Sequence, residues 1–374
     1  MTKNIQMLVI SHSFLKKINT SLYSVLKYRY NIKLKLIAPK SHYENNKVIK
    51  PDYKNDELDL NITFKETLFN HLRFKIYKNL ITSIRGQKIT NIILDMDLLS
   101  LQSIILLFYS FSFNYKVSYF SNENNILLEK KFIKKFIKKF SYKIINFIFK
   151  SKIQKIFCYT DQIKDNLNFC GLEDKTLVLP LGFNNKVFHR TLRNKNSEFV
   201  ISYFGKIERK KGIHTLLKAL KLLDIKDWVL NLDIFDIEDL NYYKTIKNDL
   251  KYLKKMGKLR LIKCNHGDIN TFMQKTDLTV VPSEWNEQYG RVIQEAAACG
   301  SIVIGSKIGA IPEILMQDSF IFEPKNANSL KNKIQDIYYN YSAYREKFFF
   351  TENYINNNRS IDTQAIIIKK AFIN

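Results

Sequence analysis

Short apolar runs alternate with longer amphipathic stretches along the whole chain. The runs of the first half predict buried strands at residues 7–10, 34–38, 92–94, 117–120 and 156–159. Those of the second half predict strands at residues 200–204, 230–235, 259–262, 278–281 and 302–304. Helical patterns follow these runs, beginning with residues 21–26. This alternation is typical of parallel sheets with helices on both faces, so the sequence predicts an α/β fold with two doubly wound domains.

The two blocks of strands meet in a polar stretch without periodicity, residues 183–197. We therefore place the domain boundary there. In open parallel sheets, ligands bind beyond the carboxyl ends of the strands. With two such domains, the site is expected in the cleft between them.

The composition is that of a globular and strongly basic protein. Apolar residues make up 45% of the 374 positions, which argues against global disorder. The net charge of +25 favours polyanionic partners such as nucleic acid, anionic lipid or phosphorylated small molecules. Heavy use of Lys, Asn and Ile throughout the chain, as in AT-rich genomes, accounts for about half of this excess.

The cysteines and the apolar segments indicate in which cellular compartment the protein is expected. Cys158, Cys170, Cys264 and Cys299 are far apart and form no CxxC pair, so we expect buried thiols in a reducing cytoplasm. The amino-terminal residues lack the pattern of a signal peptide, and no stretch of ~18 apolar residues predicts a spanning helix.

The most informative segment is residues 282–300, PSEWNEQYGRVIQEAAACG. Glu287 lies on a loop, Gly290 opens a helix over residues 291–298, and Glu295 lies about one turn inside that helix. A helix amino terminus beside a glycine favours anions. The first carboxylate can accept hydrogen bonds from sugar hydroxyls, and the second can accept them from a ribose. An ordinary helix start with acidic residues is the alternative.

A second segment, residues 204–212, carries four lysines and arginines between two glycines. Lys206 and Lys211 lie five residues apart around a turn, so both can converge on a diphosphate. The alternative is a solvated basic loop.

These segments resemble family 4 glycosyltransferases of the GT-B fold. Residues 282–300 resemble the E-x7-E signature, and Gly205, Lys206, Lys211 and Gly212 resemble the basic loop of the family. Residues 181–188 and 305–313 resemble the hinge segment and the G-G-x-P-E turn. The resemblance runs from about Ile5 to the carboxyl terminus and is best in the second half. It implies a Rossmann-like acceptor domain at residues 1–183, a similar donor domain at 184–345, and a helical segment at 346–374 that packs back on the first domain.

The resemblance also implies roles for single residues. Glu287 contacts the transferred sugar, and Glu295 holds the ribose. Lys206 and Lys211 neutralise the leaving diphosphate, beside Gly205. Gln288, Tyr289 and Gly290 offer backbone N–H groups. His266 lies in a loop that borders the nucleotide base. Members typically retain the anomeric configuration and need no metal or other cofactor, because lysines and a helix terminus stabilise the leaving charge.

The implied substrates are a nucleotide-sugar donor and a saccharide or lipid-linked acceptor. Cell-surface polysaccharide, lipopolysaccharide or glycolipid synthesis is where such members commonly act. Three departures from the family pattern affect this interpretation. Residues 11–14 replace a glycine pair, residues 236–239 replace a G-x-G-P segment, and the acceptor-domain histidine of some members is not evident. His12, Glu123 and Asn124 are the candidates for the acceptor side, with a structural histidine and a surface loop as the alternatives.

Residues 130–155 form a basic amphipathic pattern. Phe132, Phe136 and Phe140 share one helical face, and paired lysines fill the opposite one. This pattern is typical of a helix that binds an anionic membrane surface. A surface helix with its apolar face on the domain core is equally compatible. The two interpretations are compatible if the apolar face packs on the domain core while the lysines contact lipid headgroups.

Two other functions stay open at this point. One is another GT-B enzyme, either an inverting transferase or a nucleotide-sugar epimerase. The other is a non-enzymatic basic protein that binds membrane or nucleic acid. Nucleic acid is not expected as a partner, because aromatic residues are not interleaved with the basic ones outside residues 130–149.

Overall fold

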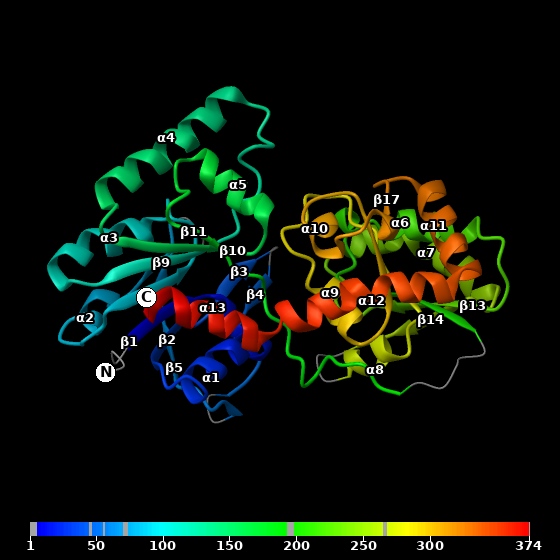
Figure 1. Cartoon of the computed structure of the whole chain (residues 1–374), viewed down its shortest axis with the longest axis horizontal. Helices are drawn as coiled ribbons and strands as arrows, with labels where there is room; N and C mark the ends of the chain where they lie inside the picture. The colour runs from blue at the N-terminus through cyan, green and yellow to red at the C-terminus, as the bar shows by residue number, and fades with distance from the viewer. Residues whose placement is uncertain are drawn as a thin grey trace. The chain divides into compact units, whose positions relative to one another are not determined.

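The computed structural model describes residues 6–44, 47–54, 57–69, 74–192, 198–264 and 268–373. Contacts divide the chain into a first unit, Met1–Gly182 with Ile361–Asn374, and a second unit, Phe183–Ser360 (Figure 1). Each unit is built on one parallel sheet, which confirms the prediction of two doubly wound, Rossmann-like domains. A cleft between them stays a prediction.

The sheet of the first unit has the order β11-β10-β9-β8-β1-β2-β5, and every pair in it is parallel. Its strands are β1 (Gln6–Ser11), β2 (Lys33–Pro39), β5 (Ile62–Lys65), β8 (Asn91–Asp95), β9 (Lys116–Ser121), β10 (Ile153–Cys158) and β11 (Thr176–Val178). Strand order reverses between β1 and β8, so the carboxyl ends of these two strands form the switch point where ligands of such sheets bind.

Helices cover both faces of this sheet. They are α1 (Ser21–Tyr28), α2 (Leu80–Ile84), α3 (Leu101–Phe113), α4 (Phe132–Phe149), α5 (Asp161–Phe169) and α13 (Ile361–Ile373). Two short hairpins are β3 (His42–Glu44) with β4 (Lys47–Ile49) and β6 (Thr67–Leu68) with β7 (Ile76–Tyr77). In β1, Leu8 packs into one core and Met7 into the other, because successive side chains of a strand point to opposite faces.

The sheet of the second unit has the order β14-β13-β12-β15-β16-β17. Its strands are β12 (Phe199–Tyr203), β13 (Trp228–Asp233), β14 (Leu259–Ile262), β15 (Leu278–Val281), β16 (Ile302–Ser306) and β17 (Ile321–Phe322). Its helices are α6 (Ile213–Lys221), α7 (Leu240–Lys255), α8 (Ile269–Gln274), α9 (Arg291–Ala298), α10 (Ile311–Leu315), α11 (Ala327–Tyr339) and α12 (Tyr341–Asn358). The switch point lies between β12 and β15.

Every predicted strand overlaps an observed one, and the helix predicted over residues 291–298 is α9. The strands that were not predicted are the short hairpin strands and β5, β11 and β17 at sheet edges. These edge strands hold two to four residues. β17 holds only two residues, and Thr63 and Lys65 interrupt the apolar residues of β5.

The carboxyl-terminal segment passes from the second unit to the first later in the chain than predicted. We predicted a segment at 346–374 on the first domain, but α12 belongs to the second unit, and only α13 joins the first. The cause is side-chain packing. Phe348 of α12 packs on Phe320 with ring centroids 4.9 Å apart, whereas Ala365 and Ile368 of α13 enter the core that contains Val9.

The four cysteine thiols are buried and free, as predicted. Of the helices that the structure describes, none combines the length and the apolar character needed to cross a membrane.

The orientation of α4 differs from the inward packing that we considered. Its apolar face is exposed along Phe132, Phe136 and Phe140, flanked by Ile133 and Ile137. We call these five residues the aromatic stripe. The helix instead turns Tyr142 and Phe149 into the domain core. Some of its lysine side chains also reach the domain.

Candidate functional site

Two loops meet at the switch point of the second unit. The basic loop, residues 204–212, follows β12, and the Glu loop, residues 282–290, follows β15. Since β12 and β15 are parallel neighbours, their carboxyl ends lie side by side. The sequence therefore folds its two most informative segments into one site, at the place where doubly wound sheets bind ligands.

Two glycines allow the backbones of this site to approach closely. Gly212 has φ +70°, and a Cβ on it would lie 1.8 Å from the carbonyl oxygen of Pro282. Gly309 has φ +59°, and its Cβ would lie 2.4 Å from the backbone N and O of Glu287. Only glycine meets both the left-handed conformation and the missing space. Packing thus requires glycine at these two positions, both of which lie in segments that resemble family motifs.

Backbone hydrogen bonds fix the Glu loop on both sides. The N–H of Glu284 donates to the carbonyl of Lys210 at 2.8 Å, and the N–H of Ala310 donates to that of Glu287 at 2.9 Å. The Glu284 carboxylate accepts from Thr215 at 2.6 Å and lies 3.1 Å from His214 Nε2. The Glu loop is thus held by hydrogen bonds on both sides of Glu287.

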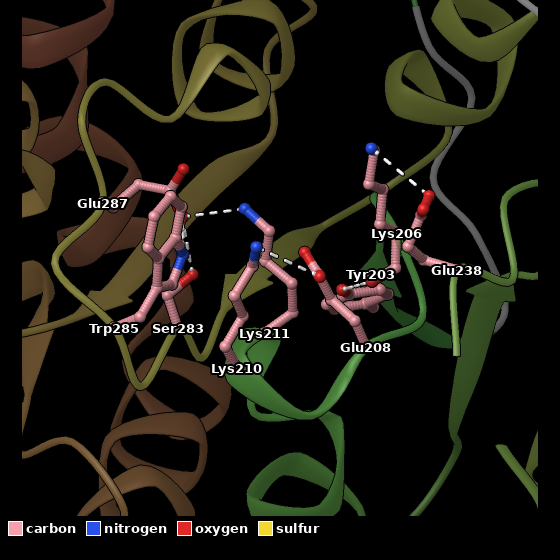
Figure 2. A network of polar contacts seen from close by, with 9 residues as sticks. All are labelled: Tyr203, Lys206, Glu208, Lys210, Lys211, Glu238, Ser283, Trp285 and Glu287. Atoms are coloured by element: carbon pink, nitrogen blue, oxygen red, sulfur yellow. Dashed lines mark hydrogen bonds and ion pairs between the residues drawn. The ribbon is translucent and has the colours of Figure 1, made fainter. Parts of the chain in front are cut away.

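Glu287 is the centre of a polar network (Figure 2). Its Oε2 accepts from Lys211 Nζ at 2.8 Å, Trp285 Nε1 at 2.8 Å and Ser283 Oγ at 3.1 Å. Within the part of the chain that the structure describes, Oε1 receives no hydrogen bond. The carboxylate is therefore anchored by one oxygen and able to accept from a ligand with the other.

Lys206 and Lys211 of the basic loop have different partners. Lys211 pairs with Glu287, whereas Lys206 Nζ lies 3.3 Å from Glu238 Oε2 (Figure 2). Glu238 belongs to residues 236–239, where the sequence departs from the family pattern. That departure supplies a carboxylate for Lys206, a contact that sequence reasoning did not predict. Gly205, with φ +141°, begins the turn between the strand and these lysines.

Trp285 joins the two loops through a second kind of contact. The Nζ atoms of Lys210 and Lys211 lie 4.6 Å and 5.3 Å from its ring centroid. Lys210 also pairs with Glu208 at 3.2 Å. Cations over an indole face are attracted by its quadrupole, so Trp285 helps to hold the positive charge of the loop in place.

Glu295 lies in α9, as predicted, and is almost fully buried. Among the described residues, no side chain or backbone group donates a hydrogen bond to its carboxylate. Burial raises the pKa of Glu295 to about 7, and Arg291, four residues earlier, opposes part of the rise. A buried carboxylate without a donor is costly, so the position is suited to ligand hydroxyls.

The residues between the two glutamates fix the start of α9. Gly290 has φ +77° and forms the N-cap. Tyr289 is buried, and its hydroxyl donates to Gln294 Oε1 at 2.7 Å. Gln288 lies beside them on the same loop.

Arg359 is a residue of this network that sequence reasoning missed. Its Nη1 donates to the Tyr289 hydroxyl at 3.3 Å, and its carbonyl accepts from the N–H of Phe183 at 3.1 Å. Arg359 therefore holds the first residue of the second unit with its backbone carbonyl and the Glu loop with its buried side chain. No local pattern could reveal this, because the partners lie 70 residues apart.

The candidates of the first unit lie at its own switch point. A pocket of about 230 Å³ is lined by His12, Asp95, Asp97, Glu123 and neighbouring residues. Asp95 accepts from Ser11 Oγ at 2.6 Å, and Asp97 accepts from the Tyr142 hydroxyl at 2.8 Å. Asp95 and Asp97 were not predicted, although they directly follow a predicted strand.

The remaining candidates differ in their placement. Glu123 pairs with Lys138 of α4. Asn124 is buried and does not line the pocket. The ring of His12 lies 4.9 Å from that of His42, whose Nδ1 contacts the buried amine of Lys75 at 2.8 Å. Burial, mainly, lowers the pKa of His42 to about 4. His266 lies outside the described residues.

Comparisons with known proteins match part of this chain to one family. Residues 184–349 match the family model of the glycosyl transferases group 1. An uncharacterized glycosyltransferase of Methanocaldococcus jannaschii is 28% identical over 190 residues, which are 49% of each chain. The capsular polysaccharide biosynthesis glycosyltransferase CapM of Staphylococcus aureus is 27% identical over 205 residues, 49% of this chain and 53% of that one. The chain spans about half the length of the curated relatives it matches.

Solved structures share the whole fold. The crystal structure of Anabaena HepE in complex with UDP covers 98% of this chain and 99% of that one, with a TM-score of 0.74 and 16% identity. A glycosyltransferase from Rickettsia africae covers 98% of this chain and 97% of its own, with a TM-score of 0.71 and 17% identity. At such identities the similarity shows the fold alone.

Proposed function

Residues 184–349 form a group 1 glycosyl transferase domain, and from this premise we propose that the chain transfers a sugar from a nucleoside diphosphate sugar to an acceptor. The observation that carries the proposal is the pair of Glu287 and Lys211 at the switch point of the second unit. A carboxylate for sugar hydroxyls and an ammonium for phosphate stand there on two loops that hydrogen-bond to each other.

The proposed chemistry follows the charges. As the bond between sugar and phosphate breaks, negative charge grows on the diphosphate, and Lys206, Lys211 and the amino terminus of α9 stabilise it. Glu287 Oε1 accepts from the sugar, and Glu295 accepts from the ribose. Gln288, Tyr289 and Gly290 contribute backbone N–H groups at the sugar or phosphate. The acceptor oxygen bonds to the anomeric carbon on the face that the phosphate leaves, and the leaving phosphate takes the proton of that hydroxyl. The anomeric configuration is thereby retained.

The acceptor side of the proposal rests on the first unit. We assign the pocket of His12, Asp95 and Glu123 to a saccharide or lipid-linked acceptor, because carboxylates accept hydrogen bonds from sugar hydroxyls. The name of CapM, a capsular polysaccharide glycosyltransferase, supports surface polysaccharide synthesis as the pathway class. The four free thiols support a reducing compartment such as the cytoplasm.

We expect a nucleoside diphosphate to bind without metal, because two lysines and a helix terminus supply the positive charge. Titration calorimetry with UDP, GDP, ADP and CDP, each with and without EDTA, checks this. UDP is the first choice, since HepE is a structural neighbour seen with UDP. If binding is lost in EDTA and restored by Mg²⁺, the metal-free donor site is wrong.

Donor affinity is expected to rise as the pH increases from 6 to 8. Ribose hydroxyls donate to a carboxylate, so the ligand favours the ionised form of Glu295, whose pKa is raised to about 7 by burial. Binding then releases a proton, which calorimetry in two buffers of different ionisation enthalpy measures directly. Glu295→Gln should bind the nucleotide more weakly, by roughly 1.5–3 kcal/mol at pH 8, and without this pH dependence.

The same variant should affect the stability of the free protein in the opposite direction. A carboxyl whose pKa is higher in the folded than in the unfolded protein destabilises the fold once it ionises. This cost is absent below the unfolded pKa of about 4.5 and complete above about 7. Glu295→Gln should therefore raise the free energy of unfolding at pH 8 by roughly 2–3 kcal/mol and change it little at pH 4.5. Equal effects at both pH values would refute the raised pKa.

A further inference from the structure

The outward face of α4 is apolar over its whole length. Phe132 is 79% exposed, Phe136 57% and Phe140 56%, and near the other end of the helix Phe147 is 87% exposed. The rings of Phe132, Phe136 and Phe140 stack on one another with centroids 6.3 Å and 6.2 Å apart. Exposed apolar patches of this kind mark interaction surfaces. In Figure 1, α4 lies along the outside of the first unit.

α3 also exposes aromatic side chains, beside the carboxyl-terminal end of α4. Phe108 and Phe111 are exposed, and their rings lie 5.1 Å and 5.9 Å from Phe149 of α4. Ile144 and Ile148 are exposed on α4 itself. Two neighbouring helices therefore present aromatic and aliphatic side chains to water.

Positive charge surrounds this patch. α4 carries five lysines and no acidic residue, and Lys130, Lys131, Lys150, Lys152 and Lys155 stand at its ends. Lys150 and Lys155 also lie near Lys175, whose pKa is lowered by burial first and by these like charges next. The surface is both apolar and cationic.

Part of the lysine face turns toward the domain. Lys138 pairs with Glu123, and the Nζ atoms of Lys139 and Lys135 lie 4.0 Å and 5.1 Å from the ring centroid of Phe169. These lysines secure the helix to the first unit. The opposite side of α4, which faces water, is therefore formed by the aromatic stripe.

We propose that the aromatic stripe, with Phe147 and the exposed rings of α3, binds an anionic lipid bilayer. The apolar side chains enter the interface between headgroups and acyl chains, and the flanking lysines pair with the headgroups. A second copy of the chain offers the same positive charge and would be repelled, whereas an anionic bilayer offers both an apolar layer and negative charge. This proposal rests on the first unit alone, so it can fail without affecting the proposed sugar transfer.

Co-sedimentation of the full chain with vesicles tests the proposal. The vesicles contain phosphatidylcholine alone or a mixture with phosphatidylglycerol. Wild type is compared with Phe132→Ser/Phe136→Ser/Phe140→Ser and with the matched control Phe349→Ser/Phe350→Ser, whose two phenylalanines are exposed on α12 of the second unit. The stripe variant should partition at least about tenfold more weakly into the mixed vesicles. The control should match wild type, and thermal unfolding of all three proteins verifies that they are folded.

A reporter placed in the stripe distinguishes insertion from attraction by charge alone. The fluorescence of Phe136→Trp should shift to the blue with mixed vesicles and be quenched by lipids brominated on the acyl chain. Equal sedimentation of the stripe variant and wild type would overturn the proposal. So would self-association of wild type that the stripe variant lacks, with no vesicle binding by either protein, because the occupant would then be a second copy.

Discussion

Gly212→Ala is expected to destabilise the second unit by more than about 4 kcal/mol and to abolish donor binding. The new Cβ would lie 1.8 Å from the carbonyl oxygen of Pro282, and 3.1 Å from Cγ of Glu284. Neither backbone can move alone, because the N–H of Glu284 donates to Lys210 on the facing loop. The basic loop and the Glu loop must therefore separate, which would break the ion pair between Lys211 and Glu287.

Gly257→Ala is the matched control. Gly257 lies in the same unit with φ +68°, and no atom lies within 4 Å of the position that a Cβ would take there. Its replacement measures the conformational cost alone, about 1 kcal/mol. Urea unfolding followed by tryptophan fluorescence reports on the correct unit, because both tryptophans, Trp228 and Trp285, belong to it. Equal destabilisation by the two substitutions would show that the loops are not held by this contact.

Glu287→Gln is expected to lower turnover by roughly 10²–10³-fold. The amide keeps the size of the side chain but removes the negative charge that faces the reacting sugar, which becomes positive as its bond to phosphate breaks. Affinity for the free nucleoside diphosphate should stay the same or increase, since Lys211 loses its carboxylate partner. Steady-state kinetics with the preferred donor, together with calorimetry, separates the two effects.

Glu284→Gln provides the comparison for this variant. Glu284 stands on the same loop, but its carboxylate contacts His214 and Thr215 rather than the basic loop. We expect a loss of stability with turnover within about threefold of wild type. If Glu284→Gln and Glu287→Gln reduced turnover equally, the role of Glu287 would be structural rather than catalytic.

The sequence predicted those features that depend on neighbouring residues. Buried parallel strands are apolar along their whole length, so most strands of both sheets were recognised from short runs such as residues 278–281. The start of α9 was recognised because Gly290 and the apolar residues after it form a local pattern. Both loops of the site were found for the same reason.

Features that depend on distant partners could not be predicted. Lys211 and Glu287 lie 76 residues apart, and Glu238 as the partner of Lys206 follows from the sheet order rather than from any motif. The orientation of α4 was undetermined because a lysine stem can pack on a domain as well as a phenylalanine can. The second unit extends to Ser360 because α12 packs on it through residues such as Phe348. No change of composition marks this boundary in the sequence.

The most direct test is the release of nucleoside diphosphate from a panel of nucleotide sugars in EDTA, with a saccharide acceptor mixture and with wild type and Glu287→Gln in parallel. Wild type should consume at least one donor and form a glycosylated product without metal, and Glu287→Gln should do so at least about 100-fold more slowly. Consumption of donor at equal rates by both proteins would contradict the assignment of the donor site to the Glu loop and the basic loop.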